Sequence, residues 1–93
     1  MNSGCLYLLN SPIEVSHWNR LREIMGPDDA LVLIEDATYL LTSHQLDVDC
    51  FYLVNDCRMR GITPPEGEHI ALKEYESLVD LTLNFAKNTT WTV

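Results

Sequence analysis

Glu35 and Asp36 are the residues of this chain whose types and spacing first suggest chemistry, because they follow directly on an apolar run at 30–34. Two neighbouring carboxylates can divide the roles of general acid and general base. Adjacent side chains on an extended strand point to opposite faces, however, and this separates the two groups. We therefore expect Asp36 to cap a helix that starts there, with Glu35 solvated or facing a partner.

Cys57 is the second candidate, since it follows a strand-like run at 50–54 and would lie in the first turn of a helix. The positive end of a helix dipole stabilises a thiolate, which suits a sulfur-carrying or redox cysteine. The alternative is that Cys57 points inward as a small core residue, and the neighbouring Asp56 would raise its thiol pKa. Cys5 and Cys50 lie inside apolar runs, which indicates packing roles.

The other familiar site patterns are absent from the sequence. Three cysteines make an odd number with no C-x-x-C pair, and we expect no disulfide between Cys50 and Cys57. The three histidines share no metal-ligand spacing with the cysteines, so we expect no metal site. No G-x-G-x-x-G, P-loop or G-x-S-x-G motif occurs, and we expect no cofactor.

Strand-like and helix-like segments alternate along the chain, which predicts an α/β fold with mostly parallel strand pairing. The predicted strands are 5–9, 30–34, 50–54 and 70–72, and the tail 88–93 could add another. Four helices are predicted between these strands. The first has the apolar residues Val15, Trp18, Leu21 and Met25 on one side and ends at Gly26, and the second runs from Asp36 to about Ser43. The third is short and lies between Asn55 as N-cap and Gly61 as C-cap, and in the last Tyr75, Leu78, Val79, Thr82 and Phe85 or Ala86 share a face.

Composition limits the classes of partner. Hydrophobic residues make up 46% of the chain, and six basic residues against fourteen acidic ones give a formal charge of -8. Direct binding of nucleic acid is therefore not expected. The sequence lacks a membrane-length apolar run and a signal-peptide pattern, which favours a cytoplasmic protein. A domain of this length has a small core, which favours oligomerisation, and Trp91 in the polar tail either packs back or anchors a subunit contact.

Taken in order, these pieces form a pattern that resembles the TusB/DsrH family. The segments that carry the resemblance are Asn10-Ser11-Pro12, Leu31 to Asp36, Tyr52 to Asp56 followed by Arg60-Gly61-Ile62, Tyr75 through Leu81, and Trp91. The resemblance implies one three-layer α/β/α domain over residues 1–93, with the DsrEFH-like fold and a small sheet of four to five strands. Two positions depart from it: Ala37 replaces a frequent glycine, which suggests helical geometry without positive φ, and Cys57 replaces an aliphatic residue.

The function implied by the resemblance is that of a subunit without catalytic residues of its own. Family complexes pair TusB-, TusC- and TusD-like chains in a heterohexamer that relays persulfide sulfur for 2-thiolation of the wobble uridine of certain tRNAs. In them the persulfide cysteine belongs to the TusD-like partner. Relatives in sulfur-oxidising organisms can have a cysteine in the first helix region, whereas residues 15–25 contain none here, which favours tRNA modification.

Two other hypotheses stay open at this point. Cys57 could itself carry a persulfide, or the chain could be a self-associating binding module unrelated to sulfur. For the leading hypothesis, Glu35, Tyr39 and Trp91 are the candidate residues of the subunit interface. The expected partners are the TusC-like and TusD-like subunits and, through the complex, sulfur-carrier proteins, and the isolated chain could form a homo-oligomer.

Overall fold

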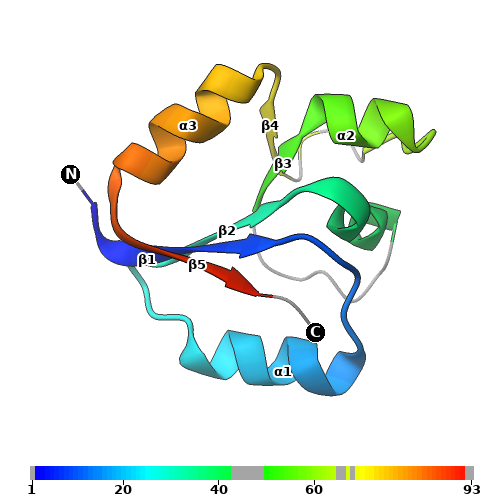
Figure 1. The fold of residues 1–93 in the computed structure, drawn as a ribbon. Coiled ribbons are helices and arrows are strands. Elements are labelled where there is room, and N and C mark those ends of the chain that lie inside the picture. Colours follow the sequence, from blue (N-terminus) through cyan, green and yellow to red (C-terminus); the bar gives the residue numbers. More distant parts are fainter. Residues whose placement is uncertain (1, 43–49, 65–66, 68, 92–93) are drawn as a thin grey trace.

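The computed structural model describes residues 2–42, 50–64, 67 and 69–91. Strands and helices alternate through these residues (Figure 1). In chain order the elements are β1 (Asn2–Leu9), α1 (Val15–Ile24), β2 (Ala30–Leu33), the 3-10 helix η1 (Glu35–Thr42), β3 (Phe51–Leu53), α2 (Val54–Met59), β4 (Ile70–Leu72), α3 (Tyr75–Leu83) and β5 (Phe85–Trp91).

All strand pairs of the described sheet are parallel, in the order β4-β3-β2-β1-β5. The apolar run of β2 lies in the centre between β1 and β3, which is why both of its faces are buried. The predicted α/β fold with a small parallel sheet is confirmed. Strand β4 has its predicted bounds, whereas β1 begins earlier than predicted.

Helices cover both faces of the sheet and make three layers, with α1 and α3 on opposite sides (Figure 1). One core cluster joins α1, η1 and α2 to the sheet; its fully buried members include Leu9, Leu21, Leu31, Leu33 and Ala37. The other cluster lies under α3 and contains Leu6, Val32, Leu53, Leu72, Leu78 and Phe85. Among the described residues, no helix is long and apolar enough to cross a bilayer.

Asp29 ties the end of α1 to the first two strands. Its carboxylate accepts the backbone N–H of Cys5 at 2.7 Å and the backbone N–H of Gly26 at 2.8 Å. Helix α1 ends at Ile24 with Met25, in extended conformation, as its C-cap; Gly26 follows the cap, and its φ is not positive. These two hydrogen bonds hold the pKa of Asp29 below its usual value of 3.8, the bond from Cys5 being the larger cause.

We expect Asp29→Asn to lower the free energy of unfolding by about 1 kcal/mol at neutral pH, a value reduced by the partial exposure of the site. The ionised form is the one that folding favours, so its contribution is complete above the usual pKa and is lost as the pH falls through the lowered one. Urea unfolding at neutral and at strongly acidic pH measures this. The exposed neighbour Asp28 provides the control substitution, Asp28→Asn, and an equal loss at both pH values for Asp29→Asn would contradict the assignment.

Helix α2 starts two residues earlier than the sequence suggested. It begins at Val54 directly after β3, without a side-chain cap, so the prediction of Asn55 as N-cap was wrong. Its end agrees with the prediction: Gly61 has φ 67° and donates to the Arg58 carbonyl, while Ile62 donates to the Cys57 carbonyl. This pair of hydrogen bonds is the Schellman motif, which requires a left-handed residue and therefore favours glycine.

The end of the chain departs most from prediction. Helix α3 ends at Leu83, and Phe85 and Ala86 belong to β5, not to the helix; residues 92–93 of the predicted tail strand lie outside the described residues. The predicted face of α3 was also wrong, since Leu78 is buried whereas Tyr75 and Val79 are 69% and 44% exposed.

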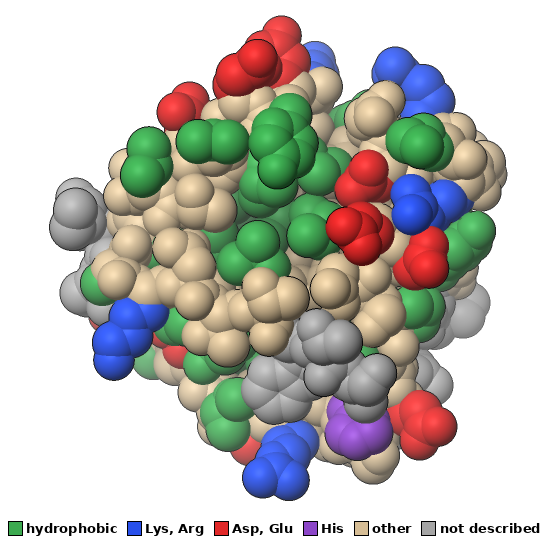
Figure 2. Space-filling view, in the orientation of Figure 1, with side chains coloured by type: hydrophobic (Ala, Val, Ile, Leu, Met, Phe, Trp, Pro, Cys, Tyr) green, Lys and Arg blue, Asp and Glu red, His purple; other side chains and the backbone are tan. Residues whose placement is uncertain are grey.

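Figure 2 shows hydrophobic side chains in a row over α3, with acidic side chains above them and to their right.

Candidate assembly site at the carboxyl edge of the sheet

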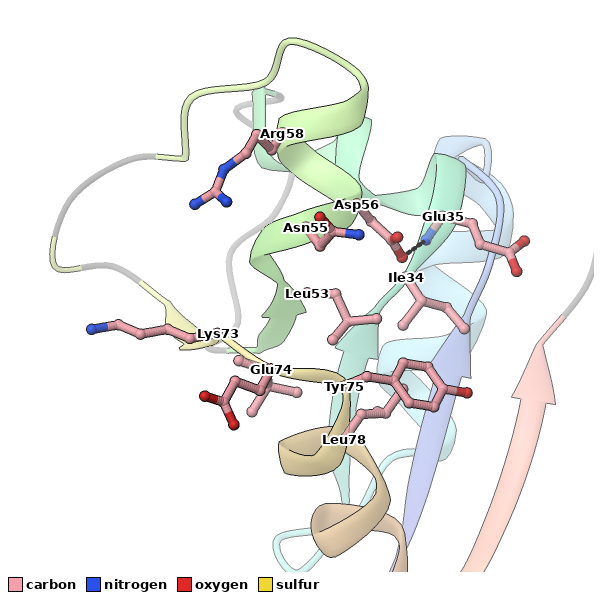
Figure 3. Close-up of a pocket in the computed structure, with 11 residues that line it drawn as sticks. Ile34, Glu35, Leu53, Asn55, Asp56, Arg58, Lys73, Glu74, Tyr75 and Leu78 are labelled. Atoms are coloured by element: carbon pink, nitrogen blue, oxygen red, sulfur yellow. Dashed lines mark hydrogen bonds between the residues drawn. The ribbon is translucent and has the colours of Figure 1, made fainter.

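A pocket of about 360 Å³ opens where β2, β3 and β4 end (Figure 3). Its apolar floor consists of the residues at or next to the strand ends, Ile34, Leu53 and Leu72, together with Leu78 of α3. Polar residues from the three following segments surround it: Glu35, Asn55, Asp56, Arg58, Lys73, Glu74 and Tyr75. The pocket exists because the carboxyl ends of parallel strands meet at one edge of a sheet, and the chain leaves each strand there.

Glu35 makes the turn between β2 and η1 in a left-handed conformation, with φ 51°. Such a conformation is strained for a residue other than glycine, and strained backbone concentrates at sites that the surrounding structure holds firmly. Here the holding group is Asp56, whose carboxylate accepts the Glu35 backbone N–H at 2.7 Å. Ala37 has no positive φ, as predicted, but the helix containing it is a 3-10 helix.

Asp36 and Arg60 form a second link across the same edge. The Arg60 Nε donates to Asp36 Oδ1 at 2.8 Å, and its Nη1 donates to the backbone carbonyl of Asp56 at 3.1 Å. The Asp36 carboxylate is therefore held in an ion pair with Arg60, and among the described residues no backbone N–H of the helix that it was predicted to cap donates a hydrogen bond to it. The hydrogen bond to Asp36 is the main cause that raises the pKa of Arg60. Together the two links fix η1 against α2.

The described lining of the pocket combines apolar side chains with charged ones. The charged ends of Arg58 and Lys73 point away from its middle, as does the carboxylate of Glu35 (Figure 3). None of the described lining residues is Cys, His, Ser or Thr. Within the described part of the chain, no three His, Cys, Asp or Glu side chains gather as metal ligands would. What remains is an apolar hollow with a charged rim, which suits insertion of a side chain from another molecule.

Cys57 lies outside this pocket, in the core between α2 and η1. Its side chain is 1% exposed, and burial raises the pKa of the thiol, an effect that the hydrogen bond with Thr38 opposes. Burial thus outweighs any help from the short helix. Cys50 is also buried, with its Sγ 3.6 Å from Nδ1 of His69, whereas Cys5 is partly exposed. No disulfide joins these three cysteines.

The three candidate interface residues fall in different places. Glu35 lines the pocket, and Tyr39 is 46% exposed on η1 without lining it. The backbone of Trp91 ends β5, and its side chain lies outside the described part of the structure. Sequence reasoning missed Tyr75 as part of this site. The signal was present, because α3 has apolar residues on more than one side.

The position of the pocket bears on its use. In open α/β sheets small ligands bind where the strand order reverses. In this sheet that point lies between β1 and β5, whereas the pocket lies at the ends of β2, β3 and β4. Fold and site therefore define a small α/β domain with a pocket at the carboxyl ends of β2, β3 and β4. The sequence model described as "DsrH like protein" matches residues 10–88, and the chain belongs to this DsrH-like family. No curated protein and no solved structure matched the chain. The family links the chain to sulfur relay and to work in a complex with other subunits.

Proposed function

We propose that this protein is a noncatalytic subunit of a TusBCD-type complex, which relays persulfide sulfur for 2-thiolation of the tRNA wobble uridine in the cytoplasm. Membership of the DsrH-like family over residues 10–88 is the observation that carries the proposal. Its partners are TusC-like and TusD-like subunits in a heterohexamer, and one of those supplies the persulfide thiol.

The environment of Cys57, the cysteine that the sequence suggested as a sulfur carrier, supports the noncatalytic role. A relay thiol has to meet a sulfur donor and an acceptor in turn, so it must be accessible and ionise readily. Cys57 meets neither condition, because it is buried and burial raises its pKa. The charge balance supports an indirect role in tRNA modification, since a chain with net charge -8 repels the phosphate backbone.

Co-expression tests the proposal directly. We expect the tagged chain to co-purify with the cognate TusC-like and TusD-like chains as one species, with equal numbers of each subunit by native mass spectrometry. Deleting its gene should remove the 2-thio group from the wobble uridine, measured by mass spectrometry of digested tRNA. Failure to assemble, or full thiolation in the deletion strain, would reject the proposal.

A further inference from the structure

Helix α3 has apolar side chains on two sides, and the domain buries one of them. Leu78 is buried and Leu81 half-buried against the sheet. On the other side Tyr75, Val79 and Leu83 follow one another at four-residue steps, and Leu83 is as exposed as Tyr75, at 69%. A helix that is apolar on both sides is normally buried on both. The second side of α3 thus lacks its cover in the isolated chain.

This exposed row continues into the pocket, because Tyr75 belongs to both. Figure 3 shows the Tyr75 ring beside Ile34 and Leu78, at the border of the hollow. We call the row Tyr75, Val79 and Leu83 together with this pocket the α3 surface. An apolar ridge next to a hollow with an apolar floor is a form that binding hot spots take, where a large side chain of a partner is desolvated.

Acidic residues border the α3 surface. Glu74, Glu76 and Asp80 lie on or next to α3, and Glu35 and Asp56 lie across the pocket. The nearby cations Lys73 and Arg58 point away from the pocket (Figure 3). Packing a second copy of the chain on this surface through α3 would bring these acids together, which is unfavourable. A partner with Lys or Arg beside its apolar residues would be attracted.

We infer that the α3 surface binds another subunit of the proposed complex, through an apolar segment that is bordered by Lys or Arg and inserts one side chain into the pocket. This inference rests on the proposed function. The interface inferred here is centred on α3. Of the three candidates from the sequence, Glu35, Tyr39 and Trp91, it includes only Glu35, which lines the pocket.

Carboxylates placed on the exposed row test the inference. We expect the double variant Tyr75→Asp, Leu83→Asp to weaken binding to the co-expressed partner chains by about 30-fold or more, because it puts charge into a desolvated contact. The matched control is Ile24→Asp, Met59→Asp, at exposed apolar positions on other helices, which should bind like the wild type. Circular dichroism and thermal unfolding check that both variants fold. Equal binding by both would overturn the inference.

Charge reversal tests the chemistry of the partner. We expect Glu76→Lys, Asp80→Lys to weaken partner binding by roughly 10-fold at low ionic strength, with a smaller effect as salt screens the charges. The control is Glu23→Lys, which changes an exposed acid on α1, a helix distant in sequence from α3. A loss that does not change with salt would contradict a basic partner. Self-association of the isolated chain that Tyr75→Asp, Leu83→Asp abolishes would show a second copy as the occupant, and would also overturn the inference.

The outcomes separate this inference from the proposed function. If the wild-type chain does not assemble with its partner chains, the proposed function fails. If it assembles and the α3 variants assemble equally well, the proposed function stands and the α3 surface is not the interface.

Discussion

Cys57 is expected to react with iodoacetamide about 100-fold more slowly than Cys5 in the folded protein, because alkylation must wait for local opening of the structure. Its side chain is 1% exposed, and burial raises the pKa of its thiol above the usual 9.0, so little thiolate forms at mildly alkaline pH. Cys5 is partly exposed at the border between β1 and β5. Mass spectrometry of peptides from a time course of alkylation gives both rates in one sample.

The same experiment in urea is the control, since unfolding exposes all three cysteines and should make their rates similar. Rapid alkylation of Cys57 in the folded protein would contradict the buried thiol. A second experiment tests Cys57 as a persulfide carrier. If Cys57 carried sulfur, treatment with a sulfur donor would add one sulfur to the wild type and none to Cys57→Ser. We expect no gain of sulfur at Cys57 in the isolated chain.

The strands β1 to β4 could be predicted because each contains an apolar run bounded by turn residues. Ala30 to Leu33 needed no tertiary information, since burial on both faces leaves a continuous apolar pattern. Ile70 to Leu72 was found as a short apolar run, although it forms the edge strand β4 and Ile70 is exposed. The Schellman end of α2 was predictable for a similar local reason, because Gly61 is the residue type that a left-handed position favours.

The carboxyl edge could not be predicted, because its structure depends on contacts between distant residues. The link from Asp56 to the Glu35 backbone spans 21 positions, and the one from Arg60 to Asp36 spans 24. Nothing in the local sequence indicates that Glu35 adopts a left-handed conformation, which is uncommon for residues other than glycine. Through these contacts the backbone N–H of Glu35 and the carboxylate of Asp36 serve two separate links, which gives no support to an acid–base pair.

The error in α3 has another cause. Periodicity shows which side chains of a helix avoid water, but it does not show whether the cover comes from the same chain or from another. Tyr75 and Val79 were assigned to the core side because they repeat with Leu78, and the structure leaves them outside. Exposed apolar residues of this kind are the observation from which the α3 surface is proposed as a contact with a partner.

Gly4→Ala is expected to lower the free energy of unfolding by about 3 kcal/mol, measured by urea denaturation. A Cβ at position 4 would overlap the backbone carbonyl of Asp28 and also crowd the amide nitrogen of Asp29. These are backbone atoms of the turn into β2, so they cannot move aside as the end of a flexible side chain can. The strands β1 and β2 would have to separate at their amino ends, where Asp29 now holds them together.

Gly26→Ala, in the turn that Gly4 contacts, is the matched control, because its Cβ would lie 3.7 Å from Asp29 Oδ2, an ordinary contact, and φ at Gly26 is not positive. Alanine there should stabilise the fold by about 0.5 kcal/mol through the unfolded chain. Equal stabilities of the two variants would contradict the close approach at Gly4. Because Gly4 and the pocket lie at opposite edges of the sheet, the folded fraction of Gly4→Ala should bind the partner chains with wild-type affinity. The α3 variants should show the opposite result, with an unchanged free energy of unfolding and weakened binding to the partner chains.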